Sequence, residues 1–405
     1  MVKLNHHFSK LSKEFFFLEI EKRAENYLKN QEGAKLLDLG IGDVSYPLSP
    51  LIAKALSEAA LEMGEKKTFR GYGPPQGYLF LREKIAAYDY KDFPISPDEI
   101  FISDGAKNDI ANIQELFSQE NRIAIPDPTY PVYLETNVIA GRTRLPLKTG
   151  SHGGITYLPC IEENGFNPEP PFSHVDVIYL CSPNNPTGIA MDRDLLKRWI
   201  SYAKKEKAII LFDAAYEAFV TGPNIPKTIY EIEGADEVAI EIRSFSKTAG
   251  FTGLRCSYTV VPHALKIFDF GSLQSLHAFW KRRHDTKFGG VAYPIQKTAA
   301  AIYTPEGQKE VKKRIGIYSE RARFLLNGLL SLGIKAYGGI DSPYLWCKTP
   351  AKINSWNFFD ILLKKAQILV VPGSGFGRLG ENFVRLSAFA EQSVLEEALI
   401  RLKDV

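Results

Sequence analysis

The chain has 405 residues, and its 50 lysine and arginine side chains nearly balance its 47 aspartate and glutamate side chains. The net charge is +3, and residues of both signs are interspersed along the sequence. There is therefore no basic stripe for binding a nucleic-acid backbone, and we expect no nucleic-acid partner. The length exceeds the roughly 250–300 residues at which one hydrophobic core stops growing, which predicts two domains or one large α/β body.

The N-terminal segment and the cysteines bear on the compartment. Residues 1–22 contain only the short apolar run 15–17, which is too brief for a signal sequence or a membrane span. The four cysteines are far apart and form no C-x-x-C pair, and no His/Cys ligand cluster is present in the sequence. We therefore expect a cytoplasmic protein with no membrane partner and no metal site.

The predicted elements alternate between helices and strands. A helix is expected near residues 14–30 and a short strand at 36–39. Short, continuous and β-branched apolar runs are typical of strands buried on both faces, and helical stretches between them indicate a mainly parallel sheet. Six such runs follow in chain order: 99–103, 122–125, 175–180, 208–212, 237–242 and 255–261.

The pattern changes from about residue 295. A long helix is expected at 307–332 and a second one at 355–366, with strands at 344–348, 368–371 and 383–387. This part is typical of an α+β domain. We therefore predict a large α/β domain over residues 46–292 and a smaller α+β domain formed by residues 1–45 and 293–405.

Polar residues follow the ends of the predicted strands. In open α/β sheets, ligands bind beyond the carboxyl ends of the strands, so polar residues placed there by distant segments are expected to converge on one site. The segments concerned are Asp104-Gly-Ala-Lys107, Asp127-Pro-Thr-Tyr130, Ser182-Pro-Asn-Asn-Pro-Thr-Gly188, Asp213-Ala-Ala-Tyr216 and Arg243-Ser-Phe-Ser-Lys247.

Two of these residues indicate a particular chemistry. A lysine that forms a Schiff base must be deliverable as a neutral amine, and a carboxylate that keeps a pyridine nitrogen protonated makes pyridoxal phosphate an electron sink. Lys247 and Asp213 suit these roles. Taken alone, Asp213 is as well explained as a helix N-cap. The upstream Asn-Asn-Pro-Thr-Gly segment and the downstream Ser244-x-x-Lys247 favour the catalytic interpretation.

The ordered set of motifs resembles the fold-type I, pyridoxal-phosphate-dependent aminotransferases over residues 36–402. That resemblance implies their fold, with a mainly parallel central sheet and a smaller α+β domain, and amino-group transfer between an amino acid and a 2-oxo acid. The matching motifs are Tyr72-Gly-Pro-Pro-Gln-Gly77, Asn185-Pro-Thr-Gly188, Asp213-x-x-Tyr216, Ser244-x-x-Lys247, Arg255 and Arg385-Leu-Ser387.

The resemblance also implies roles around the cofactor ring. Lys247 would bind the cofactor covalently and then move the proton at the substrate Cα. Asp213 would pair with the ring nitrogen, and Asn185 and Tyr216 would hydrogen-bond its phenolic oxygen. Tyr130 would stack on the ring.

The cofactor phosphate needs N–H donors and cations. Gly105, Ala106 and Lys107 open a predicted helix at 108–117, whose N-terminus suits an anion. By resemblance, Ser244 and Arg255 are further phosphate ligands. Tyr72 matches a tyrosine that reaches in from the neighbouring subunit, which implies a homodimer. The alternative interpretation of Tyr72 and Lys107 is that they are ordinary surface-loop residues with no role at the cofactor.

Arg385 lies on a short apolar segment, where an unpaired guanidinium is costly, so an anionic partner is expected. By resemblance it binds the substrate α-carboxylate, with Gly42 offering a backbone donor and Asn185 adjoining.

Longer stretches resemble the LL-diaminopimelate aminotransferases in particular, among them Leu39-Gly-Ile-Gly-Asp-Val44 and Ile242-Arg-Ser-Phe-Ser-Lys247. Three positions depart from that family's pattern. Phe15 replaces a tyrosine, Pro75 or Pro74 replaces an acid, and Gly289 replaces an asparagine. In the family these positions supply polar groups to the distal end of the substrate, and losing all three costs on the order of 10⁴ in discrimination.

Three functions stay open at this point. The first is transamination of LL-diaminopimelate, or of a related amino acid, with 2-oxoglutarate. The second is the same site acting on lysine, an arginine-derived or an aromatic amino acid, as a transaminase or as a cyclase, lyase or oxidase. The third is a pyridoxal-phosphate-binding regulator, which ranks last because the fold starts too near Met1 to leave room for a DNA-binding module.

Overall fold

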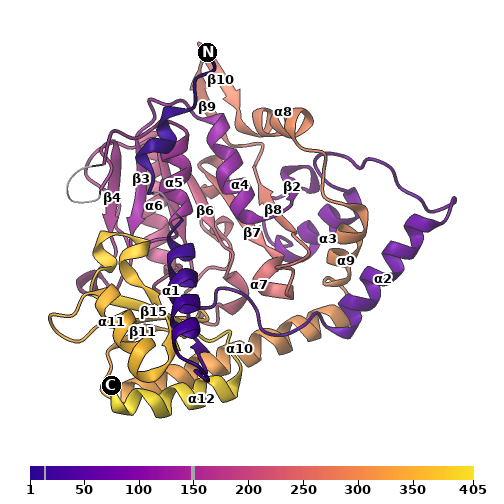
Figure 1. The fold of residues 1–405 in the computed structure, drawn as a ribbon. Helices are drawn as coiled ribbons and strands as arrows, with labels where there is room; N and C mark the ends of the chain where they lie inside the picture. The colour runs from indigo at the N-terminus through magenta and orange to yellow at the C-terminus, as the bar shows by residue number, and fades with distance from the viewer. Residues whose placement is uncertain (13–14, 147–150) are drawn as a thin grey trace.

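The computed structural model describes residues 1–12, 15–146 and 151–405. A seven-stranded sheet forms the centre of the larger part of the molecule (Figure 1), in the order β2-β8-β7-β6-β5-β3-β4. All neighbouring pairs are parallel except those made by β8, which runs antiparallel to β2 and β7. The strands are β2 (Ile100–Ser103), β3 (Ile123–Asp127), β4 (Ile155–Pro159), β5 (Val177–Cys181), β6 (Ile209–Asp213), β7 (Ala239–Ser244) and β8 (Ser257–Val260).

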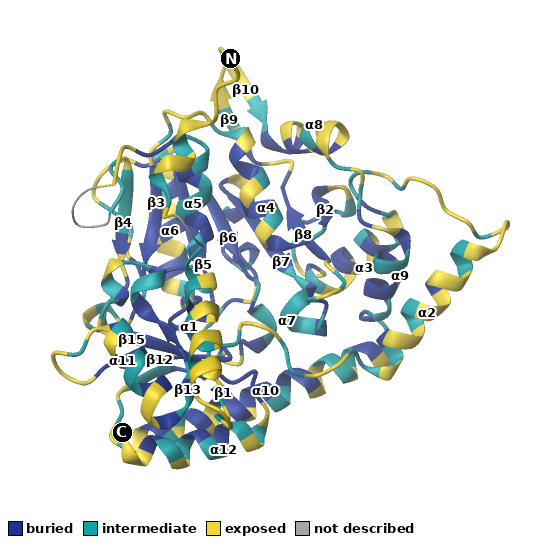
Figure 2. Ribbon diagram, viewed as in Figure 1, coloured by how far each residue is buried: buried dark blue, intermediate teal, exposed yellow. Residues whose placement is uncertain are grey.

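Both faces of this sheet are covered by helices, as the continuous apolar strands require. Alternate residues of one strand enter different hydrophobic clusters: Ile178 packs in one with Trp199, and Tyr179 packs in the other with Trp280. The first cluster draws on α3 (Leu79–Asp89), α6 (Arg193–Glu206) and α9 (Tyr293–Ala301), and the second on α4 (Ala106–Asn112), α5 (Val132–Ile139) and α8 (Leu276–Lys287). Figure 2 shows the central strands as buried.

The six predicted strands are confirmed as β2, β3, β5, β6, β7 and β8, with ends that differ by no more than two residues. The strand β4 was not predicted. It lies at the sheet edge, and its mixture of half-buried and exposed residues lacks the continuous apolar run of the others.

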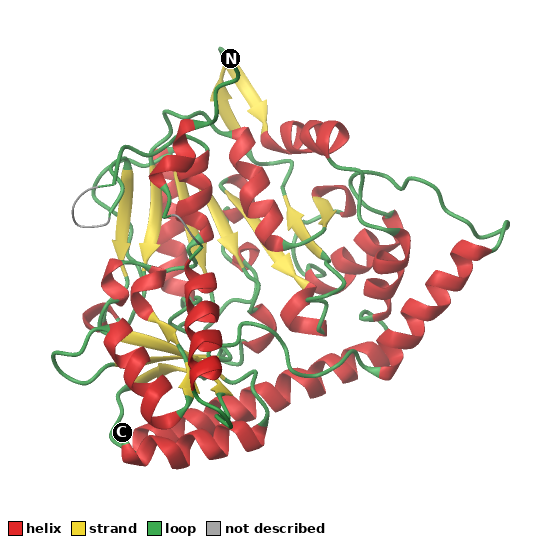
Figure 3. Ribbon diagram, viewed as in Figure 1, coloured by secondary structure: helices red, strands yellow, loops and turns green. Residues whose placement is uncertain are grey.

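A smaller antiparallel sheet has the order β11-β12-β15-β14 and lies below the central sheet in Figure 3. The predicted strands 344–348 and 383–387 are confirmed as β12 (Tyr344–Lys348) and β15 (Phe383–Ser387). The predicted strand 368–371 is instead two short strands, β13 (Ile368–Leu369) and β14 (Val371–Pro372), and β11 (Ala336–Gly338) is additional.

The N-terminal segment packs in this smaller part from α1 (Phe16–Asn30) onwards, whereas Asn5 and Lys10 donate hydrogen bonds to the carbonyl oxygens of Ile139 and Thr143 in the larger part. The strand β1 (Leu37–Asp38) pairs in parallel with β13, and Ile20 of α1 shares a hydrophobic cluster with Leu325 of α10 (Pro305–Ser331). The predicted start of α1, Glu14, lies outside the described residues. The helix α11 (Ser355–Ile361) continues into a π-helical turn, Leu362–Ala366, and α12 (Gln392–Arg401) closes the chain. The boundaries 46–292, 1–45 and 293–405 stay a prediction.

The remaining elements lie at the periphery. The helix α2 (Pro50–Gly64) and the segment after it extend away from the body on the right of Figure 1. The hairpin of β9 (Lys266–Asp269) and β10 (Ser272–Ser275) leads into α8, and α7 (Phe245–Ala249) follows β7. Within the described residues, no helix is long and apolar enough to cross a bilayer.

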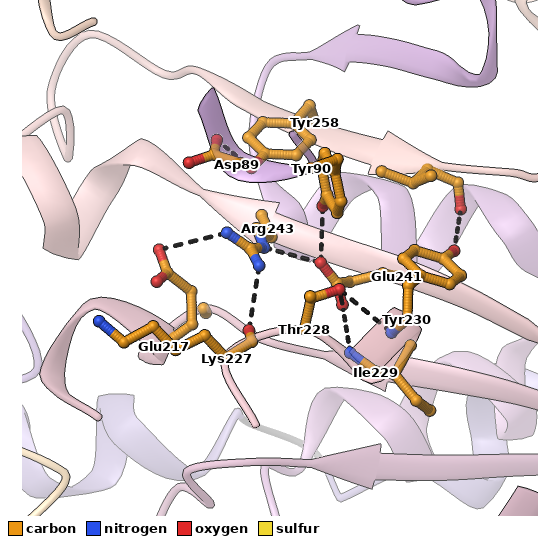
Figure 4. Close-up of polar contacts among 12 residues, drawn as sticks. Asp89, Tyr90, Glu217, Lys227, Thr228, Ile229, Tyr230, Glu241, Arg243 and Tyr258 are labelled. Carbon is orange, nitrogen blue, oxygen red and sulfur yellow. Dashed lines mark hydrogen bonds and ion pairs between the residues drawn. The ribbon is translucent and has the colours of Figure 1, made fainter. Parts of the chain in front are cut away.

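A buried network of charged residues holds β7, the strand that leads to Lys247 (Figure 4). The fully buried carboxylate of Glu241 accepts hydrogen bonds from Tyr90 (2.6 Å), Thr228 (2.7 Å) and the Ile229 N–H (2.8 Å). It also accepts one from Arg243 Nε at 2.7 Å. Four donors on one buried carboxylate compensate for its lost hydration, so the network holds the strand in register.

Candidate active site

A cavity of about 480 Å³ lies at the carboxyl ends of β5, β6 and β7, next to the smaller sheet. It collects the polar residues that follow the strands, as the sequence predicted. Its lining includes Gly42, Ala106, Lys107, Tyr130, Asn185, Asp213, Tyr216, Ser244, Lys247, Arg255 and Arg385 among the predicted residues, and Phe17, Glu21, Gly40, Asp43, Tyr133 and Tyr344 among the others.

Asp213 is a buried carboxylate at the floor of the cavity. It is the last residue of β6, and its Oδ1 accepts a hydrogen bond from the Ala215 N–H at 3.0 Å. Its Oδ2 accepts a hydrogen bond from the Tyr133 hydroxyl at 2.6 Å. Burial raises the pKa of Asp213, and these two donors oppose that effect because they favour the charged form. No cation forms an ion pair with Asp213 among the described residues, so its charge faces the cavity.

Lys247 lines the same cavity and lies on α7. Its Nζ donates a hydrogen bond to the carbonyl oxygen of Gly42. Burial lowers the pKa of Lys247 to about 8, with the charges of Arg385 and Arg255 acting in the same direction and Asp43 opposing them. An amine with this pKa exists in part as the neutral base near neutral pH, which is the form that a nucleophile or a proton carrier requires.

The Arg255 side chain approaches the backbone at the start of α4, beside the cavity. Gly105 has φ +145°, a conformation that favours glycine, and a Cβ at this position would lie 2.1 Å from an Arg255 guanidinium nitrogen, so a side chain here would also displace Arg255. Ala106 begins α4, while Lys107 and Ser244 line the same cavity. The predicted helix 108–117 is wrong in its bounds. The α-helix covers Ala106–Asn112, and a 3-10 turn, Ile113–Leu116, follows it.

Arg385 lies on β15 and is only 2% exposed. Its two terminal nitrogens donate to Asn185 Oδ1 and to the Gly40 carbonyl oxygen, both at 2.8 Å. Its Nε is buried and without a partner, and none of the described carboxylates forms an ion pair with it. The predicted anionic partner is therefore not supplied by the described residues, and the guanidinium is left to attract an anion in the cavity.

A cluster of aromatic side chains forms one wall. The Tyr216 hydroxyl lies 2.9 Å from the Tyr344 hydroxyl, and the Arg385 guanidinium carbon lies 4.3 Å from the centre of the Tyr344 ring. Tyr130 lines the cavity and lies edge-on to Tyr133, with ring centres 5.8 Å apart. These rings give the cavity a rigid apolar wall beside its charged groups.

Five predicted residues lie outside the cavity lining of the single chain: Gly105, which directly precedes the lining residue Ala106, and Tyr72, Phe15, Pro75 and Gly289. Tyr72 is 104% exposed. Phe15 is half-buried, and its ring lies 4.9 Å from the Lys107 ammonium, so it contacts a lining residue. Pro75 and Gly289 belong to two loops that touch, since a Cβ at Gly290 would lie 3.8 Å from the Pro75 Cα.

Sequence reasoning missed Tyr133, Tyr344 and Glu21. Tyr133 and Tyr344 lie inside a helix and a strand, where a tyrosine is indistinguishable from a core residue until its hydroxyl partner is known. Glu21 is one of several charged residues on α1, and only its place in the cavity lining separates it from the rest. The available signal for Tyr133 was its position three residues after the predicted Tyr130.

Comparison with known proteins agrees with this geometry. The family model "Aminotransferase class I and II" matches residues 34–402. The LL-diaminopimelate aminotransferase of Desulforapulum autotrophicum is 51% identical over 100% of this chain and 99% of its own length. That of Methanosphaera stadtmanae is 49% identical over 99% and 98% of the two chains. The solved L,L-diaminopimelate aminotransferase of Chlamydomonas reinhardtii superposes with a TM-score of 0.94 at 42% identity, covering 100% and 98%. The chain belongs to the class I and II aminotransferases.

Proposed function

We propose that this aminotransferase acts on LL-2,6-diaminopimelate and passes its amino group to a 2-oxo acid, 2-oxoglutarate by family precedent. The observation that carries the proposal is the identity of about half of all positions, over the full length of both chains, with relatives of that name. The substrate Cα is oxidised to a carbonyl carbon, and the carbonyl carbon of the 2-oxo acid is reduced to an amine.

Class I and II aminotransferases use pyridoxal phosphate, and the donor set of the cavity fits that group. A buried carboxylate without a cation, Asp213, suits a protonated ring nitrogen. The close approach of Arg255 to Gly105 leaves a side-chain-free cradle for an anion at the start of α4. The residues that would hold the cofactor are Gly105, Ala106, Lys107, Tyr130, Asn185, Asp213, Tyr216, Ser244, Lys247 and Arg255.

The bound cofactor supplies an electron sink that stabilises negative charge at the substrate Cα. The side chains of this protein supply the rest. Arg385 binds the α-carboxylate, and Asn185 fixes the direction of its fork. Lys247, with its pKa of about 8, takes the proton from the substrate Cα and would deliver it to the cofactor rather than back to the Cα. Asp213 holds the proton on the ring nitrogen, since its carboxylate has no competing cation.

The distal end of diaminopimelate is a second ammonium and carboxylate pair, and the cavity offers both opposite charges. The Lys107 ammonium and the Glu21 carboxylate line the same cavity as Arg385. They support recognition of a zwitterionic end even though Phe15, Pro75 and Gly289 are apolar or lack a side chain. Lys107 is also held against the Phe15 ring, which orients its charge.

The test is a panel of amino donors followed by mass spectrometry, with 2-oxoglutarate as acceptor. We expect LL-diaminopimelate to give a higher kcat/KM than lysine, arginine, aromatic amino acids and glutamate. Faster conversion of one of these would instead support the second function considered above, and release of other products would replace transamination.

Variants test the role of Glu21 in the same assay. Glu21→Gln should raise KM for LL-diaminopimelate about tenfold, because it removes a hydrogen-bonded charge partner, and should leave KM for glutamate unchanged. The matched control is Glu25→Gln on the same helix, where Glu25 pairs with Lys29 at the surface. Equal effects of the two variants would remove Glu21 from the site.

We further propose a homodimer with composite sites. The supporting observation is that Tyr72 is fully exposed on a segment that extends away from the body (Figure 1). Mixing the Tyr72→Phe and Lys247→Ala proteins should restore activity in hybrid dimers, and a fully active monomer in sedimentation would contradict this. A cytoplasmic location is proposed as well, supported by the four buried, free cysteines.

A further inference from the structure

Two histidines and an aspartate that are far apart in sequence meet at the surface of the large domain. Asp98 lies just before β2, and His263 lies just after β8. Because β2 and β8 are antiparallel, with Ile100 paired to Val260, these two residues emerge side by side at one end of the sheet. His277 comes from the first turn of α8 and reaches the same place.

The three residues are in direct contact. His263 Nε2 lies 2.5 Å from Asp98 Oδ2, and His277 Nε2 lies 2.9 Å from the Asp98 carbonyl oxygen. The two imidazole rings have centres 4.0 Å apart. Each residue offers one ligand atom, and the three ligand atoms lie within 4.8 Å of one another. This separation needs only small side-chain movements to surround one ion.

The backbone around the cluster is held in place by a buried carboxylate. Glu99 Oε1 accepts a hydrogen bond from the His263 N–H at 2.6 Å, and its Oε2 accepts one from the Ser96 N–H at 2.7 Å. Glu99 therefore ties the segment that carries Asp98 to the segment that carries His263. His277 is buried, and its ring packs against Phe101, with centres 5.2 Å apart. The positions of the ligands are thus set by the fold.

We propose that Asp98, His263 and His277 form a binding site for a divalent transition metal of the zinc class, outside the catalytic cavity. Two imidazoles and one carboxylate are the donors that Zn²⁺ takes, and three protein ligands leave a fourth position for water. Mg²⁺ and Ca²⁺ prefer sets made of oxygen atoms, so the site discriminates against them. The ion would join β2, β8 and α8. The sequence predicted no metal site because these ligands are separated by more than one element.

An ion can reach this cluster directly from solvent. The side chains of His263 and Asp98 are about half exposed, with relative areas of 50% and 61%. The four cysteines are buried and do not compete as surface thiolates. The three ligands are not among the residues that line the catalytic cavity. We therefore expect the bound ion to change the stability of the folded protein rather than its catalytic activity.

The test uses the full-length protein loaded with its cofactor. Titration calorimetry with Zn²⁺ should give one ion per chain, and Mg²⁺ at the same concentrations should give no binding. Co²⁺ should bind in its place with visible d–d absorption of a four-coordinate ion, and Zn²⁺ should raise the Tm.

His263→Gln, an exposed substitution that leaves the core intact, should weaken Zn²⁺ binding by at least tenfold and abolish the Tm shift. His277→Gln should do the same and keeps an amide donor for the Asp98 carbonyl oxygen. The matched control is His174→Gln, because His174 is likewise a surface histidine beside carboxylates, Asp176 and Glu206, but without a second histidine. Unchanged Zn²⁺ affinity in His263→Gln, or no Zn²⁺ binding by the parent protein, would overturn the proposal.

Discussion

The hydrogen bond from Tyr133 to Asp213 gives a sharp prediction about the cofactor site. At 2.6 Å it has the length of a charge-assisted O–H···O⁻ bond. Such bonds contribute about 1.5–3 kcal/mol, and this one favours the charged form of the Asp213 carboxyl group. In Tyr133→Phe the pKa of Asp213 therefore rises further above its ordinary value, and the carboxylate that would pair with the cofactor becomes less populated.

We expect Tyr133→Phe to bind pyridoxal phosphate about 10- to 100-fold more weakly. The pH dependence has a defined sign. Asp213 loses its charge as the pH falls, and the variant loses it at a higher pH than the parent, so the deficit in cofactor affinity should grow as the pH falls and shrink as the pH rises. The assay is equilibrium titration of apoenzyme with pyridoxal phosphate, followed by absorbance at several pH values.

The matched control is Tyr179→Phe. Its ring stacks on Tyr133 with centres 5.1 Å apart, and its hydroxyl accepts a hydrogen bond from Asn137 rather than contacting Asp213. Both variants should lose some stability in urea unfolding, and only Tyr133→Phe should show the pH-dependent loss of cofactor affinity. A change below twofold in Tyr133→Phe, or the same pH-dependent loss in both, would refute the reasoning.

Three further predictions concern single residues. Reconstitution of the apoenzyme with pyridoxal phosphate requires neutral Lys247, so its rate should rise with pH and level off above about 8; a rate still rising at pH 9.5 would contradict the lowered pKa. Gly105→Ala places a methyl group 2.1 Å from an Arg255 nitrogen, on a backbone with φ +145°. We expect the free energy of unfolding to fall by about 1–3 kcal/mol, measured by urea unfolding, and cofactor binding to weaken, measured by titration. Unchanged values of both would show that Arg255 moves freely. Glu241→Ala leaves the buried Arg243 without its closest carboxylate and should lower the free energy of unfolding by about 3–5 kcal/mol; a loss under 1 kcal/mol would be evidence against the network in Figure 4.

The strands of the central sheet were predictable because each is buried on both faces and so requires an unbroken apolar run. The edge strand β4 and the hairpin of β9 and β10 escaped prediction because much of their surface faces solvent. Their sequences therefore carry no comparable constraint, and pairing with a neighbour decides their conformation.

The residues of the active site likewise divide into those that the sequence predicts and those that it does not. Asp213 and Arg385 could be proposed because a charged residue at the end of a buried strand or within an apolar strand is unusual and has few explanations, and Lys247 could be proposed from its Ser244-x-x-Lys247 motif. Tyr133 and Glu21 could not, since an aromatic residue in a helix and an acid on an amphipathic helix are ordinary there. Their significance depends on what faces them across the cavity, and that is a property of the tertiary structure.

The pairing of β1 with β13 has a consequence for the order of folding during synthesis. Leu37 must find Ile368, so the smaller domain can be completed only when nearly the whole chain has left the ribosome. The central sheet draws on residues 100–260 and can form earlier, because domains fold as their strands emerge. Asp213 and Lys247 would then be in place while Arg385 has not yet been synthesised and the segment with Gly42 has no β13 to pair with. We expect a nascent chain stalled after the central sheet to hold the cofactor ring without yet being able to select an amino acid.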